Sequence, residues 1–229
     1  GKFDGLLLVS DFDDTLYDSH HRVPPRNLEA IQYWIQEGGR FTGATGRAHR
    51  TFAPYVHLAP INAPVVLSNG SAIYDFQSST MLIQTLLDPR APRDFAALME
   101  AIPSLGLEAY HGEDIYVCRP NAITDAHMAK VGTDYTLCPV LEMPAPWTKA
   151  IVQQEYGELL RARAWLETHC PGRYEAIFSN RYYLEITHRG CNKGGMVAKL
   201  LELLRLPQSS LYCVGDNQND IPMLARSAI

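Results

Sequence analysis

Three aspartates, Asp11, Asp13 and Asp14, follow directly after the apolar residues 6–9. A short apolar run ended by polar residues is typical of a buried strand, so these carboxylates are expected at its carboxyl end. Like charges this close raise each other's pKa unless a positive group lies between them. Mg²⁺ prefers oxygen ligands and keeps waters that a substrate phosphate can replace, so it is the positive group that this pattern favours.

A calcium-binding loop is one alternative for this segment. Counted from Asp11, the sixth position is Leu16, where such a loop needs glycine, and the twelfth is Arg22, where it needs glutamate. The calcium loop therefore fails. A polar turn with a capping aspartate is the second alternative, and it stays open for this segment alone because short motifs have many false matches.

The segment "GATGR" follows a second apolar run. The hydroxyl of Thr45 and the backbone N–H groups around Gly46 can hold a phosphate at such a turn. The alternative is a plain connection from strand to helix in which Thr45 caps the helix. Taken alone, this segment favours the plain connection.

The segment "CNKGG" places a lysine and two glycines at the expected start of a helix over residues 193–205. Lys193 in the first turn would oppose the helix dipole, and glycine costs about 1 kcal/mol against alanine inside a helix. These choices favour an anion bound at this turn, while an exposed lysine after a glycine-rich turn is an equal alternative. Replacing Lys193 is expected to leave the fold intact.

The segment "GDNQND" follows an expected strand over residues 210–214. Asn219 and Asp220 can simply cap the helix that comes next. Asp216, at the end of a buried strand, is harder to explain as a cap, so a role in binding is favoured for it.

The elements that position these segments alternate between strand and helix. Strands are expected over residues 6–9, 40–44, 64–67 and 210–214, and helices over about 25–37, from about 49, and over 193–205. This order is typical of a parallel sheet with helices on its faces. Ligands bind at the carboxyl ends of such strands, and the residues that follow them are Asp11, Thr45, Asn69 and Asp216.

The middle of the chain has a different pattern. It contains an expected hairpin that turns near His111, helices near 121–131 and 156–169, and strands near 149–153 and 174–186. We therefore predict an α/β fold: a discontinuous Rossmann-like core domain with a parallel sheet over residues 1–76 and 185–229, and an inserted α+β domain over residues 77–184.

Composition excludes several classes of protein. The net charge is −5 and no block of lysine or arginine occurs, which argues against a nucleic-acid partner. No apolar run approaches the roughly 18 residues that a membrane helix needs. The five cysteines are scattered without a C-x-x-C pair, which favours reduced thiols in the cytoplasm and neither disulfides nor a zinc site.

Together and in this order, "DFDDT", "ATGR", "NKGG" and "GDNQND" resemble the haloacid dehalogenase superfamily of phosphohydrolases, in its Cof-type branch with a large α+β cap domain. The resemblance spans nearly the whole chain. It implies a Mg²⁺-dependent phosphatase that hydrolyses small phosphate monoesters, such as sugar phosphates, through an aspartyl-phosphate. Two features depart from the pattern: Asp14 stands where many relatives have glycine, and relatives usually continue beyond Ile229 with a strand and helices.

The resemblance also implies roles for individual residues. Asp11 would be the nucleophile and Asp13 the general acid and base, with both leaving the strand on the same side if its alternation persists. The substrate phosphate would be bound by Thr45, Gly46, Lys193 and Asn219. The metal would be held by Asp11, Asp13 (through its backbone carbonyl), Asp216 and Asp220.

The expected partner is a small phosphorylated metabolite, and neither nucleic acid nor a membrane; the protein itself would be a cytoplasmic monomer or homodimer. Two other functions stay open. One is a phosphomutase acting on a sugar phosphate, because the exclusion of water depends on closure of the cap. The other is a non-catalytic relic that binds metal or phosphate, against which the intact carboxylates argue.

Overall fold

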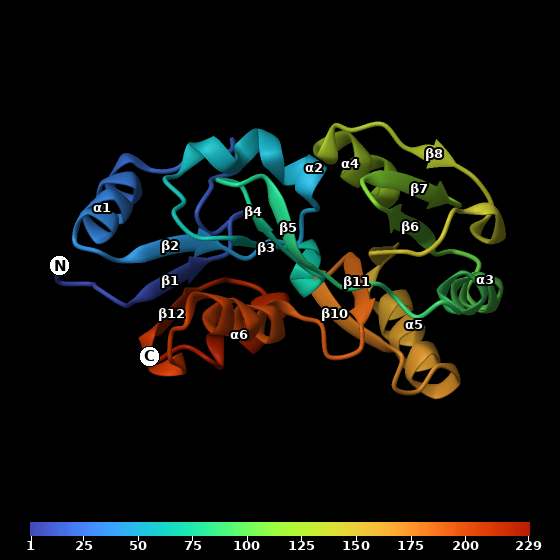
Figure 1. The fold of residues 1–229 in the computed structure, drawn as a ribbon. Helices are drawn as coiled ribbons and strands as arrows, with labels where there is room; N and C mark the ends of the chain where they lie inside the picture. The colour runs from blue at the N-terminus through green and yellow to red at the C-terminus, as the bar shows by residue number, and fades with distance from the viewer. The chain divides into compact units, whose positions relative to one another are not determined.

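A computed structural model describes all 229 residues, and they form two compact units. The first unit comprises Gly1–Gln84 and Asn192–Ile229, the blue-to-green and red parts of the chain in Figure 1, and the second comprises Thr85–Cys191. The first unit is therefore discontinuous in sequence. The chain passes between the units at 84/85 and 191/192, rather than at the expected 76/77 and 184/185.

Strand pairing explains the shifted boundaries. β4 (Ala72–Asp75) and β5 (Thr80–Gln84) form an antiparallel hairpin that pairs with β3 (Val65–Leu67), so residues 77–84 stay with the first unit. At the other boundary, β11 (Tyr183–His188) pairs on both sides within the sheet of the second unit. Each hairpin keeps its two strands in one unit.

A parallel sheet lies at the centre of the first unit (Figure 1). β1 (Leu7–Ser10) pairs in parallel with β12 (Leu211–Val214) on one side and with β2 (Arg40–Gly43) on the other. An isolated parallel bridge from Ala44 to Val66 links the end of β2 to β3. The predicted parallel arrangement is present, and it brings together strand ends that are far apart in sequence.

Helices cover this sheet. They are α1 (Pro25–Gln36), α2 (His49–Phe52), α6 (Lys193–Leu204) and α7 (Ile221–Leu224). The side chain of Asn192 accepts a hydrogen bond from the backbone N of Gly195 and so caps the start of α6. Val197 and Leu200 of this helix are fully buried in a core that contains Leu7 of β1, and each such side chain contributes about 1.5–3 kcal/mol through burial.

The second unit is a six-stranded sheet in the order β10-β11-β9-β6-β7-β8. Its other strands are β6 (Gly106–His111), β7 (Asp114–Cys118), β8 (Thr136–Leu137), β9 (Lys149–Gln153) and β10 (Tyr174–Asn180), and its helices are α3 (Ala91–Ala101), α4 (Ala122–Val131) and α5 (Tyr156–His169). The predicted α+β composition is present, although the sequence patterns missed α3 and β8. None of the helices is both long and apolar enough to cross a membrane.

Candidate active site

Asp11 is fixed at the end of the central strand. Its backbone N donates to the carbonyl oxygen of Val214 at 2.9 Å, which ties the first residue after β1 to the end of β12. Its side chain is buried, and Oδ2 accepts a hydrogen bond from Thr15 Oγ1 at 3.3 Å. The carboxylate therefore lies at the edge of the sheet where the parallel strands end.

Lys193 is the positive group beside these carboxylates. It is only 1% exposed, and its Nζ donates to Oδ1 of Asp11 and to Oδ1 of Asp220, both at 2.7 Å. Burial acts to lower the pKa of Lys193, but the two carboxylates outweigh it and the pKa is raised. The alternative of an exposed lysine is wrong: this cation joins two acidic segments from opposite ends of the chain.

The protonation of Asp11 is finely balanced. Burial raises the pKa of its carboxyl group, Lys193 lowers it and Asp220 raises it again, with a result of about 6. Burial disfavours the charged form of a carboxyl group, whereas a nearby cation favours it. Further positive charge beside Asp11 would therefore keep this carboxylate ionised at neutral pH.

Three carboxylates could hold a metal ion. Oxygen atoms of Asp11, Asp216 and Asp220 all lie within 4.8 Å of one another. When they are ionised, their three charges and the single charge of Lys193 leave two negative charges (−3 + 1 = −2). A cluster of hard oxygen ligands with this net charge fits a divalent cation such as Mg²⁺.

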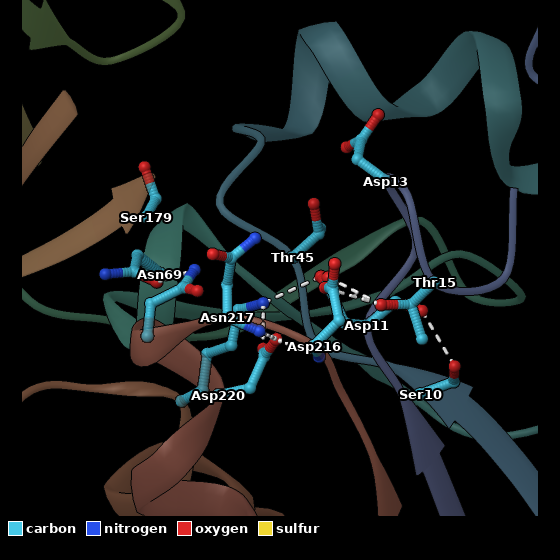
Figure 2. Close-up of polar contacts among 12 residues, drawn as sticks. Ser10, Asp11, Asp13, Thr15, Thr45, Asn69, Ser179, Asp216, Asn217 and Asp220 are labelled. Atoms are coloured by element: carbon cyan, nitrogen blue, oxygen red, sulfur yellow. Dashed lines mark hydrogen bonds and ion pairs between the residues drawn. The ribbon is translucent and has the colours of Figure 1, made fainter. Parts of the chain in front are cut away.

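The loop that carries two of these residues is held by its own hydrogen bonds. Asp220 Oδ2 accepts from the backbone N of Asp216 at 3.0 Å and of Asn217 at 3.1 Å. Gly215 allows this close turn, since a Cβ at that position would lie 2.5 Å from the Cβ of Asp220. Figure 2 shows Asp216 beside Asp11, with Thr15 donating to Asp216 Oδ1 at 2.8 Å.

The carboxylate of Asp13 does not join this group. Figure 2 shows it directed away from Asp11 and Asp216. The alternation expected after β1 is lost because the chain turns at once, and Asp14 has a left-handed backbone with φ of 61°. The expectation that residues 11 and 13 point to the same side is therefore wrong for this structure.

Arg47 holds Asp13 in this position, and the sequence patterns did not assign it a role. Its Nε donates to Asp13 Oδ2 at 2.8 Å and its terminal nitrogen donates to Oδ1 at 2.9 Å. The guanidinium also lies 4.7 Å from the centre of the Tyr55 ring. Burial acts to lower the pKa of Arg47, but the hydrogen bonds and charge of Asp13 raise it. The third residue of "TGR" was the available signal for this pair.

Apart from Lys193 on α6, the residues expected to bind phosphate come from two loops. Thr45 is buried, and its Oγ1 accepts from the backbone N of Arg47 at 3.1 Å; Gly46 lies between them in the same turn. Asn219 donates from Nδ2 to Oδ1 of Asn69 at 3.2 Å. The backbone N of Asn69 donates to the carbonyl oxygen of Thr45 at 3.0 Å, so the loops that carry these two residues lie side by side. The first unit thus brings the expected residues together, with the side chain of Asp13 as the exception.

Residues 8–229 match the profile of the family described as haloacid dehalogenase-like hydrolase. An HMP-PP phosphatase of Serratia proteamaculans (strain 568) is 26% identical over 220 residues, which cover 96% of this chain and 80% of that protein. An HMP-PP phosphatase of Yersinia pseudotuberculosis serotype O:1b (strain IP 31758) is 25% identical over 222 residues, which cover 96% of this chain and 80% of that protein.

Solved structures share the fold. A haloacid dehalogenase-like hydrolase from Bacteroides thetaiotaomicron superimposes with a TM-score of 0.81 at 20% identity, covering 98% of this chain and 86% of that one. A sugar phosphatase of HAD subclass IIB gives a TM-score of 0.83 at 18% identity, and the match covers 98% of this chain and 85% of that one. The predicted α/β core with an inserted α+β domain is thereby confirmed.

Proposed function

Because the chain belongs to the haloacid dehalogenase-like hydrolase family, we propose that it hydrolyses small phosphate monoesters through a phosphorylated Asp11, with Mg²⁺ as its cofactor. The observation that carries this proposal is the buried Asp11 carboxylate, which contacts Lys193 and lies in one oxygen cluster with Asp216 and Asp220. The similarity to HMP-PP phosphatases supports a small phosphorylated substrate.

Asp11, Asp216 and Asp220 would hold Mg²⁺, which supplies positive charge that neutralises phosphate oxygens when it is bound. A carboxylate oxygen of Asp11 attacks phosphorus, and the bond from phosphorus to the leaving oxygen breaks. Asp11 Oδ1 accepts from Lys193 at 2.7 Å, whereas Oδ2 has only the longer 3.3 Å contact with Thr15 Oγ1, so Oδ2 is the less tightly held oxygen and the better placed to attack. Thr45 and Gly46 would orient the phosphoryl group through the hydroxyl and backbone N–H groups.

Asp13 would transfer the protons. In the first step its carboxyl group gives a proton to the leaving oxygen; in the second, its carboxylate takes one from the water that attacks phosphorus, and Asp11 is released with free phosphate. In this structure both carboxylate oxygens of Asp13 accept hydrogen bonds from Arg47. Proton donation therefore requires Asp13 to leave Arg47 and turn toward the substrate.

The first prediction tests the cofactor together with the reaction. A screen of phosphate esters should release free phosphate with Mg²⁺, release none after thorough chelation, and recover when Mg²⁺ is restored. Full phosphate release after chelation, or conversion of a sugar phosphate into its isomer without free phosphate, would contradict the proposal.

A second prediction concerns metal binding without turnover. Mg²⁺ at about 100 times its Kd should stabilise the folded protein by about 2.7 kcal/mol, because it binds only the folded state. Asp216→Asn should reduce this gain, since it removes one of the charged ligands. Melting temperatures with and without Mg²⁺ measure the effect. Asp4→Asn, at an exposed position, is the control, and an equal loss of the gain in both variants would refute the assignment.

A further inference from the structure

Two cysteines occupy neighbouring positions at the outer edge of the sheet in the second unit. β8 is the last strand of this sheet and pairs in parallel with β7, with Val117 opposite Leu137 (Figure 1). The backbone N of Cys138 donates to the carbonyl oxygen of Val117 at 3.1 Å, so the same register continues past the end of β8. Cys118, the last residue of β7, therefore lies opposite Cys138.

The two cysteine side chains lie on the same face of the sheet. Side chains alternate between the two faces along a strand, so residues two positions apart share a face. Cys118 and Cys138 both pack against the apolar core of the second unit, and so does Tyr116, two residues before Cys118. The two thiols are therefore neighbours on one side of the sheet.

A small molecule can reach both thiols. Cys118 and Cys138 are free in this structure and half-buried, whereas Cys170 and Cys191 are buried. The half-buried pair lines one cavity of about 780 Å³, together with apolar residues such as Met99. Cavities of about 300–1,000 Å³ are typical of sites that accept small molecules. A low-molecular-weight disulfide such as oxidised glutathione can therefore approach this pair.

The spacing of the two strands suits a disulfide that is easily reversed. Neighbouring strands lie about 4.8 Å apart, whereas the Cβ atoms of a disulfide are about 3.8 Å apart, so one strand has to move by about 1 Å. β7 is held on its other side by β6. β8 is only two residues long and pairs with β7 alone, so β8 can make this movement. A disulfide that holds a strand away from its relaxed position is strained, and strain makes the bond more reducible.

We propose that Cys118 and Cys138 form a reversible disulfide, which joins β8 to β7 when the protein is exposed to a low-molecular-weight disulfide such as oxidised glutathione. This modification site lies within the second unit and does not depend on the proposed phosphatase reaction.

The bond forms in two exchange steps. The thiolate of one cysteine attacks a sulfur atom of oxidised glutathione, the sulfur–sulfur bond of glutathione breaks, and one glutathione leaves as a thiolate. The thiolate of the second cysteine then attacks the cysteine sulfur of this mixed disulfide and releases the second glutathione. Two protein thiols are oxidised to one disulfide, one glutathione disulfide is reduced to two thiols, and the two protons pass from the cysteines to the released glutathiones.

Counting thiols after equilibration with oxidised glutathione tests the proposal. The folded protein is quenched with acid, unfolded and alkylated: five cysteines should be labelled before oxidation and three after it (5 − 2 = 3). Peptide mapping should find Cys118 linked to Cys138. Burial, Glu142 and Cys118 all raise the pKa of Cys138, so its reactive thiolate is scarce at neutral pH. The end point of the exchange, rather than its rate, is therefore measured.

Single-cysteine variants distinguish a pair from one reactive thiol. In Cys118→Ser and in Cys138→Ser the second exchange step is lost, so glutathione should stay attached to the remaining cysteine in at least one of them. Cys213→Ser, at a half-buried cysteine of the first unit, is the matched control and should still form the link between residues 118 and 138. Absence of the glutathione adduct from both single variants would contradict the exchange route.

Two further measurements connect the bond to the fold. Excess reduced glutathione should cleave the link, because strained or exposed disulfides are labile whereas unstrained structural ones resist the glutathione pool. In protein unfolded by urea the strand register is lost, so the links should spread over all five cysteines. Five labelled thiols after oxidation of the folded protein, adducts on Cys118 and Cys138 without a link, a link that excess reduced glutathione leaves intact, or the same links in folded and unfolded protein would overturn the inference.

Discussion

Replacing Lys193 by methionine is expected to destabilise the metal-free protein by about 3–5 kcal/mol and to abolish phosphate release. The lysine is buried and donates to Asp11 and Asp220. Removing one partner of a buried ion pair leaves an uncompensated charge, which accounts for a loss of this size. From the sequence, Lys193 was treated only as a cation in the first turn of a helix, and its replacement was expected to leave the fold intact. The present prediction replaces that expectation.

The destabilisation of Lys193→Met should depend on pH. Lys193 lowers the pKa of Asp11, so its removal raises that pKa above the value of about 6 found with the lysine present. A carboxyl group whose pKa is higher in the folded state than in the unfolded state favours folding only while it is protonated. The variant should therefore be least impaired near pH 4, about the pKa of an unfolded aspartate, and lose stability as pH rises through the folded-state pKa.

Urea unfolding with and without Mg²⁺ measures this effect. Mg²⁺ should recover part of the lost stability, because it supplies positive charge to the same carboxylates, but it should not restore phosphate release. Lys199→Met is a matched control, since Lys199 is exposed on the same helix. Wild-type stability of Lys193→Met in the absence of metal would show that the two ion pairs contribute nothing to the fold.

The sequence was sufficient to predict the residues that follow the strands. Asp11 and Asp216 come together because β1 and β12 are parallel neighbours, which the alternation of strands and helices already indicated. The family match confirms the predicted haloacid dehalogenase family and its enzyme class, a phosphomonoester hydrolase. Periodicity and motif order were enough for these predictions. They depend only on residues that are close together in sequence and on the rule that ligands bind at the carboxyl ends of parallel strands.

The features that were missed depend on contacts between distant residues. The burial of Lys193 depends on Asp11, 182 positions away in sequence. The direction of Asp13 depends on Arg47, 34 positions away, and on the left-handed turn at Asp14. Helical and strand periodicity reflects only residues that are close together in sequence, so it cannot predict contacts between distant residues. These features therefore became visible only in the structure.

Asp13→Asn is expected to slow phospho-enzyme formation by about 10²–10⁴ for alkyl esters and only weakly for activated aryl esters. An alkoxide leaves poorly without a proton, whereas a nitrophenolate leaves well. Asparagine keeps the backbone carbonyl and nearly the shape of Asp13, but it cannot donate that proton. Breakdown of the aspartyl-phosphate should slow for both esters, because the attacking water loses its base. Aryl esters should therefore show one burst of product and then stall.

Rapid-quench measurements of the released alcohol, with one alkyl and one aryl ester, distinguish this role from a structural one. Asp14→Asn is the matched control: Asp14 is exposed beside Asp13, and asparagine tolerates its left-handed backbone. Asp11→Asn should remove the burst altogether. Loss of the ion pair with Arg47 could also disturb the loop, but such damage would slow both esters alike because it does not depend on the leaving group. Equal losses in the burst rate would therefore restrict Asp13 to a structural or metal-binding role, and unequal losses of the predicted order would place the proton on Asp13.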